Sequence, residues 1–225
     1  AKRIEAVFNL DPLVKNTIQD NVIDDETTIE FDHVTFVYPD GEEPVLSDVT
    51  FKAKKGEMVA FIGSTGSGKS TLVNLIPRFY DVTSGSIKIN NQDIRNYDLL
   101  KLRDMLGVIP QKAILFSGSI AENIRFGKKD ATMEEIEHAA KIAQAYSFIM
   151  EKEHGFDEEI SEGATNVSGG QKQRLSIARA LVRKAPIYIF DDSFSALDFK
   201  TDATLRHELK KELKDSIMLV IAQRI

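Results

Sequence analysis

Residues Gly63 to Ser70, GSTGSGKS, have the composition of a loop that closes around phosphate groups. They match G-x-x-x-x-G-K-[ST] at every fixed position and lie between an apolar strand, MVAFI, and a predicted helix. Glycines let backbone N–H groups surround phosphate oxygens, and the helix N-terminus adds a partial positive charge. Lys69 is expected to reach the β- and γ-phosphates of a nucleotide, and Ser70 to bind Mg²⁺. The predicted phosphate-binding residues are Gly63, Ser64, Thr65, Gly66, Ser67, Gly68, Lys69, Ser70 and Thr71.

The stretch IYIFDD, residues 187–192, is a buried-strand pattern that ends in two carboxylates. Pro186 stops the preceding helix, so the strand delivers Asp191 to the carboxyl edge of a sheet, beside the phosphate loop. An aspartate at that place holds Mg²⁺, and Asp192 is then expected to lie over the attacking water. The alternative is that Asp191 only caps a turn. A phosphate loop with this aspartate still leaves kinases, GTPases, motors and transport ATPases open.

A second helix start, VSGGQKQR from Val167, contains two glycines that need a reason. Ser168 and Gln171 form a capping box, yet Gly169 and Gly170 each cost a helix about 1 kcal/mol relative to alanine. Bare glycine N–H groups at a helix N-terminus form an anion site. Because the chain already has its own phosphate loop, this second site is expected to serve the nucleotide of another subunit. The alternative is a flexible helix start.

Composition and hydrophobic periodicity indicate the fold that positions these residues. The 225 residues carry a net charge of −6, which argues against nucleic-acid binding, and contain no cysteine for disulfides or thiolate metal sites.

Strands alternate with helices on both sides of a helical stretch. Ser119-x-x-Glu122 and Thr132-x-x-Glu135 predict capped helices in that stretch, and a phase slip at Asp32-His33 predicts a turn or bulge between strands. The predicted fold is α/β, with a mostly parallel sheet and a helical subdomain near residues 112–175.

With these motifs in hand, the chain from about residue 28 to 225 resembles the nucleotide-binding domain of ABC transporters of the exporter type. Val167 to Gln171 looks like the family signature, with Val in place of the usual Leu. The resemblance implies a P-loop NTPase (RecA-like) core with an antiparallel β subdomain, and ATP and Mg²⁺ as cofactors. It also implies that two such domains sandwich two ATP molecules head to tail, each phosphate loop facing the other domain's signature. Four further matches carry implied roles. Gln111 would contact Mg²⁺ and the attacking water, and Ser195 to Asp198 would be the D-loop, with Asp198 in contact with a nucleotide. Tyr38 would stack on adenine, or else is an edge-strand core residue, and residues 115–127 would lie near the transmembrane coupling helices.

Two departures from the family pattern concern catalysis. The family usually has Glu where this chain has Asp192, and His where it has Gln223. Loss of one methylene draws the carboxylate back by roughly 1.5 Å, and a misplacement of about 1 Å can cost about a hundredfold in rate. Glutamine can donate a hydrogen bond but cannot carry a positive charge. The pair of changes resembles the degenerate site of heterodimeric exporters, so we expect a weakened ATPase site and a second, competent partner domain. The alternative is a homodimer in which both residues work adequately.

The resemblance also sets expectations for the whole protein. Residues 1–27 are expected to be a linker from a preceding transmembrane region, which would hold the domain at the cytoplasmic face of the cell membrane. The family continues past the position of Gln223 with further strands and helices, so this chain is expected to be part of a longer domain. A soluble ABC ATPase of DNA repair or translation is the runner-up, although it would be expected to carry a coiled-coil insertion or a basic second domain. A small-molecule kinase would give no reason for Ser168 to Gln171.

Overall fold

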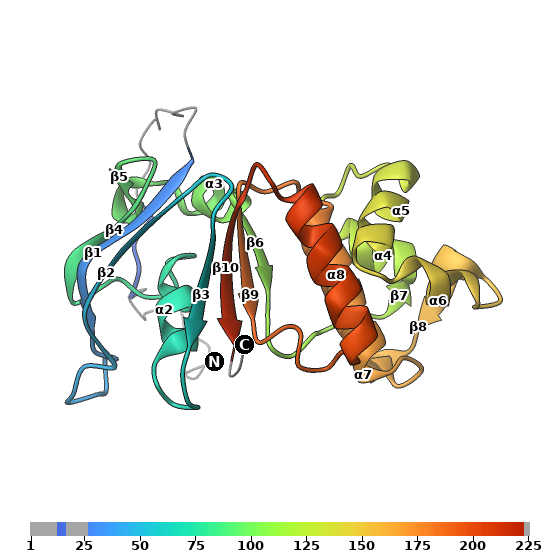
Figure 1. The fold of residues 1–225 in the computed structure, drawn as a ribbon, viewed down its shortest axis with the longest axis horizontal. Coiled ribbons are helices and arrows are strands. Elements are labelled where there is room, and N and C mark those ends of the chain that lie inside the picture. Colours follow the sequence, from blue (N-terminus) through green and yellow to red (C-terminus); the bar gives the residue numbers. More distant parts are fainter. Residues whose placement is uncertain (1–12, 17–26, 223–225) are drawn as a thin grey trace, which may run out of the picture.

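The computed structural model describes residues 13–16 and 27–222, which form two four-stranded sheets and a helical side. Figure 1 shows an antiparallel sheet at the left, a parallel sheet in the centre and most of the helices at the right. The antiparallel sheet has the order β2-β1-β4-β5. Its strands are β1 (Thr28–Phe36), β2 (Leu46–Lys54), β4 (Ser84–Ile89) and β5 (Gln92–Asp93).

The phase slip predicted at Asp32-His33 is a bulge inside one continuous strand. The register of β1 against β2 shifts between Phe31 and Val34, and His33 has a φ of 50°. A bulge leaves one residue unpaired and bends the strand, which explains why the alternation of apolar side chains changes phase there.

The central sheet has the order β3-β10-β9-β6, and all its neighbouring strands are parallel. It confirms the predicted parallel core. β9 and β10 are buried along almost their whole length, as expected for strands covered on both faces. The strands are β3 (Met58–Ile62), β6 (Leu106–Ile109), β9 (Ile187–Asp191) and β10 (Ile217–Ala222).

Helices cover both faces of the parallel sheet. Alternate residues of β9 enter different cores: Ile187 and Ile189 pack towards α2 and the antiparallel sheet, and Tyr188 and Phe190 pack towards the helical side. The helices are α2 (Lys69–Leu75), α3 (Leu99–Asp104), α4 (Ile120–Arg125), α5 (Met133–Ile142), α6 (Tyr146–Met150), α7 (Gly169–Leu181) and α8 (Phe199–Glu212). None of the helices in the described ranges is long and apolar enough to cross a membrane.

The capping boxes predicted from sequence are all present. Ser119, Thr132 and Ser168 each accept a backbone N–H three residues later, and Glu122, Glu135 and Gln171 reach back to the cap residues. The pairing of β7 (Gly118–Ser119) with β8 (Glu159–Ile160) was not predicted, because two-residue strands show no periodicity. Together, β7 and β8 join the start of α4 to the segment that leads into α7.

Candidate nucleotide-binding site

The phosphate loop connects the end of β3 to the start of α2, and Gly68 makes that connection possible. Gly68 is the N-cap of α2 with a φ of 86°, and a Cβ added there would lie 2.9 Å from the carbonyl oxygen of Val45. An L side chain is therefore excluded by both conformation and space. Within the described part of the chain, no side chain caps α2. The first N–H groups of α2 are therefore available to an anion, which makes the loop a candidate anion site.

Lys69 folds back over the loop from which it comes. Its Nζ donates hydrogen bonds to the carbonyl oxygens of Gly63 and Ser64, both at 2.7 Å, and to Ser67 Oγ at 3.1 Å. These contacts hold the ammonium inside the loop, where a phosphate would lie. A bound phosphate would give the ammonium charge-assisted hydrogen bonds, which are stronger than those to neutral oxygens.

Ser70 and Asp191 meet although 121 residues separate them. Ser70 Oγ donates to Asp191 Oδ1 at 3.2 Å, which brings the end of β9 to the first turn of α2. Burial raises the pKa of the Asp191 carboxyl, and Asp192 raises it further, whereas Ser70 and Lys69 lower it. A nearby cation would stabilise the charged form of a carboxylate in this setting, so Ser70 and Asp191 together fit Mg²⁺. In the described residues no group of three or more His, Asp or Glu could hold a metal. Phosphate oxygens and water would supply the remaining ligands.

Gln111 and Asp192 form the next layer of the same cleft. Gln111 Nε2 donates to Asp192 Oδ2 at 3.3 Å. Asp192 has a φ of 46°, and its backbone N–H donates to the carbonyl oxygen of Ile221 at 3.1 Å. The turn after β9 is therefore fixed to β10, and it aims Asp192 towards Gln111. An open cavity of about 210 Å³ is lined by Val45, Thr65, Gly66, Gly68, Lys69, Ser70, Thr71, Gln111, Asp191, Asp192 and Ile221.

Tyr38 lies beside α2, outside the residues that line this cavity. Its hydroxyl is 2.9 Å from Thr71 Oγ1, and its ring packs edge-on against Phe36 and Tyr80 at 4.9 and 5.3 Å between centroids. The side chain is half-buried. These contacts belong to the core at the edge of the antiparallel sheet, and stacking on adenine stays a prediction.

The glycine-containing start of α7 does not join the chain's own phosphate loop. No residue from Ser168 to Gln171 lines the cavity. Figure 1 shows the parallel sheet between α2 and α7. A Cβ added at Gly169 would meet no atom within 4 Å, whereas one at Gly170 would lie 3.2 Å from the carbonyl oxygen of Ala196. The exposed side of this helix start is thus left open.

Asp198 lies in the segment that Gly170 touches, where it caps α8. Its Oδ1 accepts the N–H of Thr201 at 3.0 Å, and hydrogen bonds with Thr201 lower the pKa of its carboxyl. Asp198 therefore has a structural role as the N-cap of α8. Its contact with a nucleotide stays a prediction. Gln223 lies outside the described residues.

Two residues of the cavity had no signal in the sequence analysis. Val45 and Ile221 line it, and the backbone of Val45 also limits the residue at position 68. Apolar residues in or beside a strand give no chemical signal, so only the fold brings them to the site.

Comparison with known proteins gives one consistent result. Residues 46–195 match the family model described as ABC transporter. A protein of Staphylococcus aureus strain NCTC 8325 is 47% identical over 197 residues, and one of the bovine strain RF122 is 46% identical. Both carry names that describe multidrug export ATP-binding/permease proteins, and in each the match spans 88% of this chain and 34% of the relative.

A solved structure, that of a bacterial Atm1-family ABC exporter with ATP bound, agrees with a TM-score of 0.93 at 33% identity. The agreement covers 99% of this chain and 39% of that one, and it confirms the predicted P-loop NTPase fold. The chain therefore spans about a third of the length of these relatives. Because the family match covers more than half of the residues and includes both the phosphate loop and Asp191, the chain belongs to the ABC transporter family.

Proposed function

We propose that this chain is the ATP-binding domain of an exporter, in which ATP binding and hydrolysis drive movement of a substrate across a membrane. The observation that carries the proposal is the meeting of Ser70 and Asp191 at 3.2 Å beside the loop that holds Lys69. A hydroxyl and a carboxylate at that place suit Mg²⁺, and the loop suits the phosphates that Mg²⁺ would bridge. The solved relative is described with ATP bound, which supports the same ligand here.

The signature residues would act on the nucleotide of a second domain. Two observations support this arrangement: the space beside Gly169 is open, and Ser168 to Gln171 do not line the cleft. N–H groups at a helix N-terminus favour an anion. In a head-to-tail pair, each ATP would lie between the phosphate loop of one domain and Ser168 to Gln171 of the other. The D-loop with Asp198 would lie at the same junction, since Ala196 packs on Gly170.

The chain's own site would bind ATP well and hydrolyse it slowly. Asp192 is one methylene shorter than glutamate, and Gln111 Nε2 already donates to it at 3.3 Å. A glutamine at position 223 cannot supply the charge of a histidine. We therefore infer a heterodimer, in which a partner domain has the competent phosphate loop and this chain completes it with its signature.

Two neighbouring hollows beside β6, which share Phe79, Val108 and Arg179, would receive the transmembrane coupling helices. Apolar residues with substantial exposure line these hollows, including Phe79, Val108, Ile114 and Phe126. Arg179 lies beneath Phe126, with the guanidinium 5.7 Å from the ring centroid. Exposed apolar surface of this kind marks an interaction site. The domain would then sit at the cytoplasmic face of the membrane. The names of the relatives, which describe export ATP-binding/permease proteins, support the association with a membrane.

Turnover and bound ATP, measured in parallel, test the proposal of a weakened site. The native chain is compared with the double variant Asp192→Glu and Gln223→His. We expect the native chain to bind Mg-ATP and turn it over slowly, and the double variant to be faster by at least about tenfold, because the carboxylate regains its reach. A native chain that already turns over as fast as the variant would exclude the weakened site and favour a symmetric homodimer. A native chain that binds no ATP would exclude the proposed function itself.

A further inference from the structure

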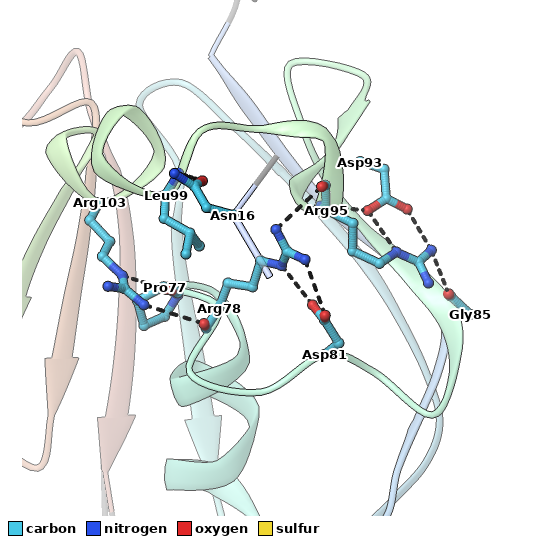
Figure 2. Close-up of polar contacts among 9 residues, drawn as sticks. All are labelled: Asn16, Pro77, Arg78, Asp81, Gly85, Asp93, Arg95, Leu99 and Arg103. Atoms are coloured by element: carbon cyan, nitrogen blue, oxygen red, sulfur yellow. Dashed lines mark hydrogen bonds and ion pairs between the residues drawn. The ribbon is translucent and has the colours of Figure 1, made fainter. Parts of the chain in front are cut away.

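Asn16, in the segment before the first strand, is attached to the N-terminus of α3. Its Oδ1 accepts the backbone N–H of Leu99 at 2.8 Å, and its Nδ2 donates to Asp98 Oδ2 at 2.9 Å (Figure 2 shows the contact with Leu99). The other oxygen of Asp98 accepts the N–H groups of Leu100 and Lys101. Two side chains thus satisfy the first three N–H groups of α3, and one of them comes from more than 80 residues away.

α3 depends on such contacts because it has only six residues. A helix of this length is not stable alone in water, so its caps and packing decide whether it forms. The contact with Asn16 also stabilises the charged form of Asp98, since the hydrogen bond from Asn16 is the main cause of the lowered pKa of its carboxyl. Asn16 therefore stabilises α3 both directly, at Leu99, and through Asp98.

The last turn of α3 is attached to the end of α2. Arg103 Nε donates to the carbonyl oxygen of Pro77 at 3.1 Å, and its Nη2 to that of Arg78 at 3.4 Å. Arg78 is buried, has a φ of 56°, and pairs with Asp81 through two hydrogen bonds of 2.7 and 3.1 Å. It also donates to the carbonyl oxygen of Arg95 at 3.2 Å (Figure 2). The turn after α2 is thus firmly held, and Arg103 connects α3 to it.

The same end of α3 is attached to the chain just after α7. Arg183 Nη2 donates to Asp104 Oδ1 at 2.9 Å and to the carbonyl oxygen of Arg103 at 3.4 Å. α3 is therefore attached to the turns that directly follow α2 and α7. The N-termini of these two helices carry the glycines of the phosphate loop and of the signature.

We propose that Asn16 is a latch: it fastens residues 13–16 to α3, and α3 carries their position to the turns that follow α2 and α7. Asn16 is then a positioning residue for helices that face phosphates. The consequence for ATP rests on the function proposed above, whereas the mechanical connection does not.

Amide hydrogen exchange of the nucleotide-free chain tests the connection. Asn16→Ala is compared with Lys15→Ala, an exposed neighbour on the same segment. Loss of a typical hydrogen bond corresponds to a change of about fivefold, so exchange at Leu99, Leu100 and Lys101 is expected to rise by about that factor. The latch also predicts faster exchange at the amides of Arg78 and Phe79, which are not touched by Asn16. The proposed latch would be overturned if Asn16→Ala speeds exchange in α3 alone, or if Lys15→Ala has the same effect as Asn16→Ala.

Two further variants test the two contacts of Asn16 and the role of α3. Asn16→Asp replaces the donor to Asp98 with a second carboxylate, and repulsion between the two carboxylates should draw the side chain away from Leu99, so we expect Leu99 to lose at least as much protection as in Asn16→Ala. Arg103→Ala should speed exchange at Arg78 and Phe79, and adding Asn16→Ala to it should change those two amides no further. Fully additive effects at Phe79 would show that α3 does not carry the signal. ATP affinity of the same variants is a separate readout, so failure of the proposed function would leave the exchange result intact.

Discussion

At the scale of single residues, the site depends on a few side chains that the fold places within hydrogen-bond distance of one another. Asp191 and Asp192 are adjacent, yet the first faces Ser70 and the second faces Gln111. The strand end and a turn with positive φ at Asp192 separate their roles. In the proposed function, Asp191 would hold Mg²⁺ and Asp192 would face the attacking water.

Gly68 gives a prediction with a matched control. Gly66 and Gly68 have nearly the same positive φ, but an added Cβ is blocked only at Gly68, by the carbonyl oxygen of Val45. Gly66→Ala should cost about 1 kcal/mol of unfolding free energy for its conformation, and Gly68→Ala about 1 to 3 kcal/mol more, because the backbone must move. Urea denaturation of both variants measures the difference. Equal losses would show that the contact with Val45 is not limiting.

At the scale of elements, Glu135 ties the start of α5 to two other segments. It accepts hydrogen bonds from Lys184, after α7, and from Lys128, before α5, and these bonds lower the pKa of its carboxyl to about 2. A folded-state pKa below the unfolded one adds stability above the unfolded value, and that stability is lost as the pH falls.

The difference in stability between the native chain and Glu135→Gln should therefore be constant above about pH 5 and shrink as the pH falls from 4.5 towards 2. Glu137→Gln on the same helix is the control, because the only ion pair of Glu137 with a described residue is a long one, to Lys141 at 3.7 Å. Urea titrations at a series of pH values give both curves. A difference that persists unchanged at pH 2.5 would show that the ion pairs of Glu135 are not its source.

Local sequence patterns predicted the elements that have a clear period or cap, and tertiary contacts account for the rest. The parallel strands, the capping boxes and the aspartate at the end of β9 follow from rules that act over a few residues. The latch at Asn16, the buried Arg78 and the self-contacts of Lys69 depend on groups that meet only in the folded chain. No spacing of residues in the sequence predicts that Asn16 will cap the helix that begins at Leu99. The β7–β8 pair escaped prediction because its strands are only two residues long.

At the scale of the whole molecule, the proposed pairing of two domains can be tested at Gly169. Its surroundings are open in the single chain, so Gly169→Asp should leave unfolding free energy unchanged, or raise it slightly through the helix dipole. The same carboxylate would repel the phosphates of a partner's ATP. We expect ATP binding to the chain's own loop to persist while ATP-dependent association with a second domain is lost.

Sedimentation with and without Mg-ATP measures that association, with either a second copy or a partner domain present. Gly170→Ala is a useful contrast, because its Cβ would press on the carbonyl oxygen of Ala196 and disturb the single chain as well. Undiminished association of Gly169→Asp would place the signature outside the junction and contradict the sandwich.

The central claim is that the phosphate loop and Asp191 together form a Mg-ATP site, and equilibrium ATP binding with and without Mg²⁺ tests it most directly. The native chain should bind ATP more tightly with Mg²⁺. Asp191→Asn should lose most of that gain, a drop in affinity of about 10- to 100-fold, and keep its Mg²⁺-free binding. Lys69→Ala should weaken both. Equal affinity of the native chain with and without Mg²⁺, or an Asp191→Asn variant that keeps the full gain, would contradict the account.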